Sequence, residues 1–108
     1  MNLIQHFVGG ELFSGSSDKK GKVFNPATGE QKSEVILANK SDLNKTVNIA
    51  KEAFESWSVK PALQRARVMF NCKELIEKNT EELTELIVSE HGKVYEDAKG
   101  SLTRGLEV

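Results

Sequence analysis

The sequence has few cysteines, prolines and aromatic residues, and it has no long hydrophobic run. Its single cysteine, Cys72, rules out an internal disulfide and a zinc site built from several cysteines. No stretch reaches the roughly 18 consecutive apolar residues of a transmembrane helix, and the first ten residues lack the pattern of a secretory signal. We therefore expect a cytoplasmic protein in a reducing environment, with no membrane partner.

An excess of charge of one sign is also absent. Lysine and arginine number 15 and aspartate and glutamate 16, which gives a net charge of −1. Proteins that bind nucleic acid or anionic membranes through surface charge carry an excess of positive charge, so we expect neither partner. The hydrophobic share of 38% and the charged share of 29% are typical of a globular domain, and 108 residues suit one domain with a small core.

The first extended segments surround a pair of glycines. Gly9-Gly10 separates Leu3–Val8 from Glu11–Phe13, and two glycines supply the positive φ angles that a two-residue turn needs. This pattern predicts a short β-hairpin. The following segment, Ser14–Lys22, has no apolar anchor and predicts a mobile loop.

A second pair of extended segments surrounds a proline and a glycine. Lys22–Phe24 and Gln31–Ala38 are separated by Asn25–Glu30, in which Pro26 presets φ and Gly29 tolerates a positive value. We expect a tight reversal between two strands.

Helical periodicity dominates the chain from Ser41 onward. Apolar residues recur at spacings of three and four in three runs, Ser41–Trp57, Pro61–His91 and Val94–Leu106. Ser41 is the predicted N-cap of the first run, and Asn79 with Glu82 forms a capping-box pattern that divides the second run into two helices. The sequence thus predicts an α+β fold in one domain, with short β-hairpins and a loop over residues 1–40 and three to four α-helices over residues 41–108.

The last apolar run is still continuing where the sequence stops. Tyr95, Ala98, Leu102 and Leu106 lie on one helical face, and no capping glycine or polar tail follows them before Val108. We therefore expect residues 1–108 to be the amino-terminal fragment of a longer protein. The alternative is a self-standing helical module that binds other proteins, and such a module should cap its last helix.

Short segments throughout the chain occur in the order and spacing of a known family. They are Phe24–Glu30, Ala53–Trp57, Arg65–Arg67 and Glu90–Lys93. This pattern resembles the aldehyde dehydrogenase superfamily. Further segments resemble its methylmalonate-semialdehyde dehydrogenase branch in particular: His6–Gly10, Arg65–Phe70, Lys99–Gly100 and Arg104–Val108.

The resemblance implies an enzyme that oxidises methylmalonate or malonate semialdehyde with NAD and transfers the acyl group to coenzyme A, with loss of carbon dioxide. It also implies that these residues form the amino-terminal part of the family's α/β NAD-binding domain. The family's cysteine nucleophile, oxyanion asparagine and cofactor-binding βαβ segments all lie beyond Val108. We therefore expect residues 1–108 to contain no catalytic or cofactor-binding residue and to be inactive alone. The expected partners are the rest of the dehydrogenase chain and further copies of it in a homo-oligomer.

Arg104 is the predicted substrate-binding residue. By the resemblance, it matches an arginine that looks like a clamp for the substrate's carboxylate, and the arginine fork fits that group with two parallel donors. The alternative is a surface arginine paired with Glu107 or Asp97.

A monovalent cation site is the second prediction that the resemblance carries. In the wider superfamily such a site uses the position that matches Glu90, with backbone oxygens beside the Asn-Pro turn, here the carbonyls of Val23 and Phe24. The alternative is a solvated glutamate near a helix end.

Three other residues invite a catalytic interpretation and do not support one. Cys72 lies on or beside an apolar stripe, so we expect a small buried hydrophobic residue rather than a nucleophile. His6 falls on the predicted hairpin, and His91 precedes a helix-ending glycine, where an imidazolium is favoured by the helix dipole. We expect neither histidine to bind a metal.

Overall fold

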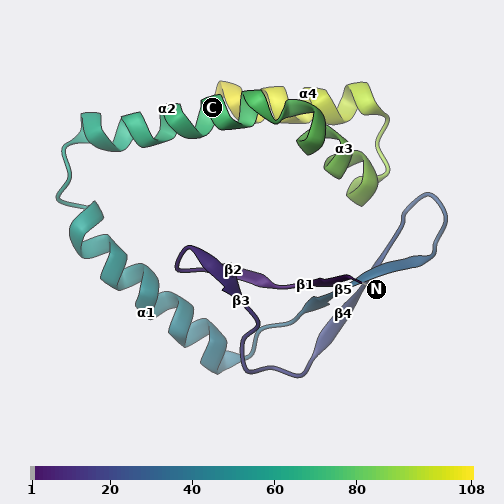
Figure 1. Ribbon diagram of the computed structural model, residues 1–108, viewed down its shortest axis with the longest axis horizontal. Helices are drawn as coiled ribbons and strands as arrows, with labels where there is room; N and C mark the ends of the chain where they lie inside the picture. Colours follow the sequence, from purple (N-terminus) through teal and green to yellow (C-terminus); the bar gives the residue numbers. More distant parts are fainter. Residues whose placement is uncertain (1) are drawn as a thin grey trace. The chain divides into compact units, whose positions relative to one another are not determined.

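The computed structural model describes residues 2–108 (Figure 1). The strands are β1 (Asn2–Ile4), β2 (His6–Val8), β3 (Glu11–Phe13), β4 (Lys20–Phe24) and β5 (Gln31–Ile36). The helices are α1 (Lys40–Trp57), α2 (Ala62–Lys78), α3 (Thr80–His91) and α4 (Tyr95–Glu107). Strands followed by four helices confirm the predicted α+β class.

The chain forms two compact units. The first contains the residues up to Phe24 together with Glu30–Lys60, and therefore all five strands and α1. The second contains the turn Asn25–Gly29 and Pro61–Val108, and therefore α2, α3 and α4. The sequence predicted strands first and helices after them, and the order of elements along the chain is as predicted. The first helix, α1, nevertheless contacts the strands and belongs to their unit.

The main sheet of the first unit has the order β1-β5-β4. β1 pairs with β5 in parallel, with Leu3 opposite Glu34, whereas β4 pairs with β5 antiparallel. The predicted hairpin from Leu3 was therefore wrong at its start, because Leu3 and Ile4 join a strand about 30 residues away. Ser33 and Ile36, both on the central strand β5, are buried. The central strand thus supplies the buried positions of this sheet.

The hairpin β2–β3 confirms the rest of that prediction. His6 pairs with Phe13, and Gly9 and Gly10 have φ angles of 65° and 86°, which are the values that a two-residue turn of this type requires. A side chain added at Gly9 would contact Ile49 of α1 at 3.5 Å. The tip of the hairpin therefore lies against α1.

α1 begins with a capping box that includes Asn39 and Asp42. The Asn39 side chain accepts a hydrogen bond from the Asp42 N–H at 2.9 Å, and the Asp42 carboxylate accepts one from the Asn39 N–H at 3.0 Å. Ser41 was therefore the wrong N-cap. The loop predicted to be mobile is anchored at Ser16, whose N–H donates to Asp42 Oδ1 at 2.7 Å, and β4 starts at Lys20 instead of Lys22.

The predicted reversal at Asn25–Glu30 is confirmed. The Gly29 N–H donates to the Asn25 carbonyl at 2.8 Å, and the Ala27 N–H donates to the Asn25 side chain at 2.9 Å. Gly29 has a φ of 75°, in the region that glycine adopts without steric cost.

The joint between α2 and α3 falls at Asn79, as predicted, but its capping differs. Asn79 caps no N–H of α3; its side chain donates instead to the Leu75 carbonyl at 2.7 Å, at the end of α2. The predicted capping box of Asn79 and Glu82 was therefore wrong. Asn79 has φ −108° and ψ 21°, which differs from the extended conformation of a residue that caps a helix start.

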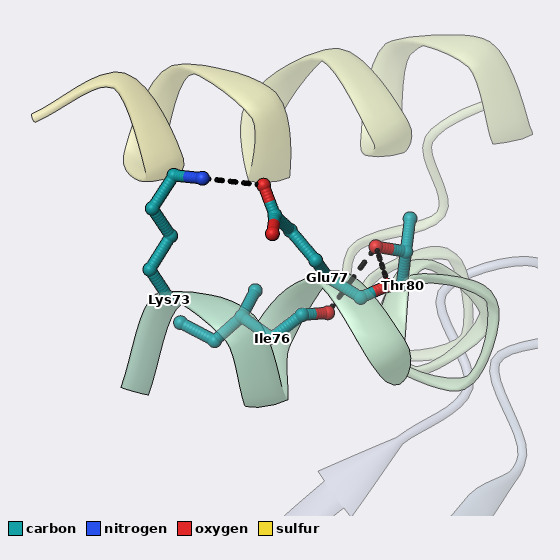
Figure 2. A network of polar contacts seen from close by, with 4 residues as sticks. All are labelled: Lys73, Ile76, Glu77 and Thr80. Atoms are coloured by element: carbon teal, nitrogen blue, oxygen red, sulfur yellow. Dashed lines mark hydrogen bonds and ion pairs between the residues drawn. The ribbon is translucent and has the colours of Figure 1, made fainter. Parts of the chain in front are cut away.

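The Thr80 side chain, on the α3 side of the joint, contacts carbonyl groups at the end of α2 (Figure 2). The Thr80 hydroxyl lies 3.2 Å from the Ile76 carbonyl and 2.9 Å from that of Glu77, so it donates back into the last turn of α2. One turn earlier, Lys73 pairs with Glu77 at 2.6 Å, with both side chains about half exposed. The Thr80 hydroxyl thus gives carbonyl groups at the end of α2 a hydrogen-bond donor. The exposed Lys73–Glu77 ion pair contributes roughly 0.3–0.5 kcal/mol to stability.

α3 ends at His91, is capped by Gly92 and packs against α4. Gly92 has a φ of 81° and its N–H donates to the Val88 carbonyl at 2.8 Å, which confirms the predicted C-terminal glycine. Thr84 of α3 and Ala98 of α4 are completely buried. A side chain added at Gly92 would meet the Pro26 ring at 3.1 Å, so the turn of the second unit lies against the end of α3.

Few large hydrophobic residues are buried within residues 2–108. Ile36 and Ala98 are the buried hydrophobic residues of this part of the chain. Large apolar side chains of α1 and α2 are exposed: Leu43, Val47, Phe54, Trp57, Leu63, Val68, Met69, Phe70 and Leu75. Between 2 and 108, no helix has the combination of length and apolar character that crossing a membrane demands.

Candidate functional site

Arg104 lies in the last turn of α4, the helix that the sequence predicted for it. Glu96 and Asp97 occupy the first turn, and a cation at the far end is favoured by the helix dipole. Ala98 anchors the helix through its buried methyl group, while Arg104 is exposed. The helix is therefore packed at Ala98, while the Arg104 side chain in its last turn is exposed to solvent.

The hydrogen-bond partner of Arg104 is a serine one turn earlier. Arg104 Nη2 donates to Ser101 Oγ at 3.1 Å, and Lys93 Nζ donates to the same oxygen at 2.9 Å. Ser101 Oγ in turn donates to the Asp97 carbonyl at 3.2 Å. The structure thus brings two cationic side chains to one hydroxyl.

The alternative partners predicted for Arg104 are not the ones it uses. Within residues 2–108, Arg104 forms no ion pair with the carboxylate of Asp97 or Glu107. The contact of α4 with Asp97 is made by Ser101, whose hydroxyl donates to the backbone carbonyl of Asp97. Arg104 is thus exposed, as that alternative expected, but it does not form the ion pairs, and its role as a substrate clamp stays a prediction.

The residues of the predicted cation site belong to different units. Val23 and Phe24 belong to β4 of the first unit, where a bulge between them shifts the register against β5. Glu90 is an exposed residue near the end of α3, in the second unit. The site of Glu90 with these two carbonyls stays a prediction. Among residues 2–108, no three His, Cys, Asp or Glu side chains cluster as a metal site.

Cys72 occupies an exposed position on α2, so the prediction of a buried cysteine was wrong. It borders an apolar groove between α2 and α4 of about 370 Å³, together with Met69, Phe70 and Leu106. The periodicity placed Cys72 on or beside an apolar stripe, and it does lie beside apolar residues of α2. Those residues line an open groove, so Cys72 is exposed.

The two histidines lie in different surroundings. His91 is the exposed last residue of α3, as predicted. His6 is half-buried on β2, and its Nε2 is buried without a hydrogen-bond partner in the structure.

Asp42, at the start of α1, has a perturbed pKa. Its pKa is lowered from the usual 3.8, first by the hydrogen bond from the Asn39 N–H, while burial opposes this and the Ser16 N–H and hydroxyl add to it. A carboxylate that accepts several N–H bonds is stabilised in its charged form. All of these partners belong to the loop and the helix start, so Asp42 has a structural role.

Sequence reasoning proposed Arg104 as a site residue and did not consider Ser101 or Lys93, which lie next to it in the structure. Both lie within segments that carried the resemblance or flanked it, Glu90–Lys93 and Lys99–Gly100. The available signal was the spacing of three residues from Ser101 to Arg104, which places the two side chains on one helical face. Lys93 precedes α4, and only the turn after Gly92 brings it back to Ser101.

Comparison with known proteins identifies the class to which this fold belongs. The model of the aldehyde dehydrogenase family matches residues 13–108. The chain belongs to the aldehyde dehydrogenase family, which confirms the resemblance seen in the sequence. The fold matches the amino-terminal part of the structures of that family.

The individual relatives point to one branch of the family. The chain is 42% identical over 104 residues to malonate-semialdehyde dehydrogenase of Halalkalibacterium halodurans, covering 96% of this chain and 21% of that protein. It matches the crystal structure of methylmalonate-semialdehyde dehydrogenase from Oceanimonas doudoroffii with a TM-score of 0.95 and 42% identity, over 99% of this chain and 22% of that one. A Sinorhizobium meliloti 1021 protein solved with NAD gives a TM-score of 0.96 and 41% identity, over 99% and 22%. The chain thus spans about a fifth of the length of the curated relatives it matches.

Proposed function

We propose that residues 1–108 form the amino-terminal portion of an NAD-dependent, coenzyme A-acylating dehydrogenase of methylmalonate or malonate semialdehyde. The observation that carries the proposal is the 42% identity to a malonate-semialdehyde dehydrogenase over 96% of the chain. The NAD complex of a structural neighbour at 41% identity supports NAD as the cofactor. Coenzyme A as the acyl acceptor follows from the resemblance to this branch.

The chemistry of the reaction belongs, in this proposal, to residues outside this chain. Cys72 is the chain's single cysteine; by the resemblance it falls where the family has no catalytic residue, and in the structure it borders an apolar groove that Lys73 also lines. The aldehyde-attacking cysteine and the NAD and coenzyme A sites are therefore assigned to the rest of the dehydrogenase. That remainder and other copies of the enzyme in a cytoplasmic homo-oligomer are the proposed partners.

Arg104 is the residue through which this portion would serve the reaction. We propose that its guanidinium binds the carboxylate of the semialdehyde, because a planar fork of N–H donors matches the two oxygens of that group. Its exposure and its place on a helix supported by buried Ala98 support this role. The group that distinguishes the substrate from a simple aldehyde would thus be read by α4.

The test is the activity of the complete dehydrogenase towards two kinds of aldehyde. NADH and acyl-coenzyme A formation are measured with malonate semialdehyde and with propanal, for the parent enzyme and for Arg104→Ala. We expect kcat/KM for the semialdehyde to fall by about a hundredfold, as for the loss of a charge-assisted pair, and the value for propanal to change little. Absence of NADH formation from the semialdehyde by the parent enzyme would overturn the activity, and equal losses on both aldehydes would overturn the clamp.

A further inference from the structure

Ser101 holds two cations that come from different parts of the second unit. Lys93 lies before the start of α4, while Arg104 lies in its last turn. Their nitrogens approach Ser101 Oγ at 2.9 and 3.1 Å, so the two nitrogens are no farther apart than these two distances together. Such a pair of like charges is held close only if something fixes it.

The hydroxyl of Ser101 has the donors and acceptors for this task and none to spare. A serine hydroxyl donates one hydrogen bond and accepts two. Its donation goes to the Asp97 carbonyl at 3.2 Å, and its two acceptor positions take Lys93 and Arg104. The carbonyl therefore fixes the direction of the hydroxyl, and the hydroxyl fixes the two cations.

The charge of this pair is not neutralised by the chain around it. Within residues 2–108, neither Lys93 nor Arg104 forms an ion pair with a carboxylate. An ammonium has three donors and a guanidinium five, and each uses one of them on Ser101. The remaining donors of both groups are available for an anion with more than one oxygen.

We propose that Lys93 and Arg104 together bind one carboxylate, and that Ser101 is the positioning residue that sets their spacing. The proposal rests on the proposed function, in which the carboxylate is that of the semialdehyde, and it deepens it by adding a second cation and its support. Two cations on one carboxylate select a substrate with a terminal carboxylate over an aldehyde with an alkyl end. Ser101 acts through the two cations and touches no substrate atom.

The experiment compares Lys93→Ala and Ser101→Ala in the complete dehydrogenase, with two readouts. KM and kcat are measured with malonate semialdehyde and with propanal, and malonate is titrated as an unreactive competitor of propanal oxidation. We expect Lys93→Ala to raise KM for the semialdehyde and the inhibition constant of malonate by about tenfold, the loss of one charge-assisted hydrogen bond. Ser101→Ala should act in the same direction by a smaller factor, Ser101→Thr should restore the parent values, and the losses should fall on KM for the semialdehyde more than on its kcat.

Matched controls on the same helix separate this role from general effects. Lys99→Ala removes a positive charge from α4 at a side chain that is not among the hydrogen-bond partners of Ser101. Thr103→Ala removes a hydroxyl that donates to the Lys99 carbonyl at 3.0 Å and touches neither cation. Both should leave the malonate inhibition constant within about twofold of the parent, a change of less than 0.5 kcal/mol.

The outcomes distinguish this proposal from the proposed function. If Arg104→Ala loses the semialdehyde selectively while Lys93→Ala and Ser101→Ala do not, the two-cation site is overturned and the arginine clamp stands. If the complete protein oxidises no semialdehyde, calorimetric titration of malonate still decides: binding weakened by Lys93→Ala supports the site, and unchanged or absent binding overturns it.

Discussion

Asp42 joins a loop and a helix through one carboxylate, which makes it sensitive to pH. Its pKa is lowered from 3.8 chiefly by the Asn39 N–H. A group whose pKa is lower in the folded state contributes stability that is fully present above the unfolded value and is lost as pH falls through the folded value. Asp42 should therefore stabilise the first unit at neutral pH and cease to do so below its folded pKa.

The measurement is the free energy of unfolding of the parent and of Asp42→Asn, from pH 7 down to about pH 2. We expect the parent to be more stable down to about pH 4 and the difference to shrink at lower pH. Asp18→Asn is the control, because it removes the same charge from an exposed position of the same loop. A difference for Asp42→Asn that is the same at every pH would contradict the prediction.

Alanine variants of Gly15 and Gly10 distinguish the free-energy cost of a positive φ from the cost of a steric clash. Gly15 has a φ of 70°, and a Cβ there would lie 2.8 Å from Asp42 Oδ2. Gly10 has a φ of 86° with no atom within 4 Å of the added Cβ. Gly10→Ala should cost about 1–2 kcal/mol through the backbone alone, and Gly15→Ala about 1 kcal/mol more because the carboxylate must move. Equal losses in denaturant unfolding would show that the Asp42 carboxylate gives way freely.

The start of α1 is the element on which a local sequence rule chose the wrong residue. Asn39→Ala should destabilise the chain by about 1 kcal/mol, since it removes the acceptor for the Asp42 N–H. Ser41→Ala should change stability by less than about 0.5 kcal/mol, because Ser41 is an exposed residue inside the helix. Thermal unfolding followed by circular dichroism checks both, and a larger loss for Ser41→Ala would restore Ser41 as the cap.

Local sequence rules could predict the helices and strands. They could not predict the long-range contacts that decide which of two possible capping boxes forms or which strands pair. The spacing of three residues that defines a capping box occurs at both Asn39 and Asn79, and it is realised at Asn39, where Asp42 also binds Ser16 from 26 residues away. The parallel pairing of β1 with β5 has no local signal either. For the same reason Arg104 could be placed on its helix, whereas the approach of Lys93 to Ser101 required the turn after Gly92 to be known.

At the scale of the whole chain, the exposed apolar side chains of α2 predict self-association. Met69 and Phe70 are each 64% exposed and border the groove between α2 and α4. Contiguous exposed apolar surface on a soluble chain drives association. We therefore expect residues 1–108 to sediment with a mass that rises with concentration.

A charge-matched pair of variants tests whether this surface is responsible. Met69→Lys/Phe70→Lys should weaken the association by at least about tenfold, because burying one such side chain stabilises a contact by about 1.5–3 kcal/mol. Gln64→Lys/Asn71→Lys adds the same charge at exposed polar positions of α2 and should weaken it much less. Sedimentation velocity over a range of concentrations measures both. A parent chain that stays monomeric throughout would show that its apolar side chains find no partner in a second copy, and equal weakening by the two variants would assign the effect to charge.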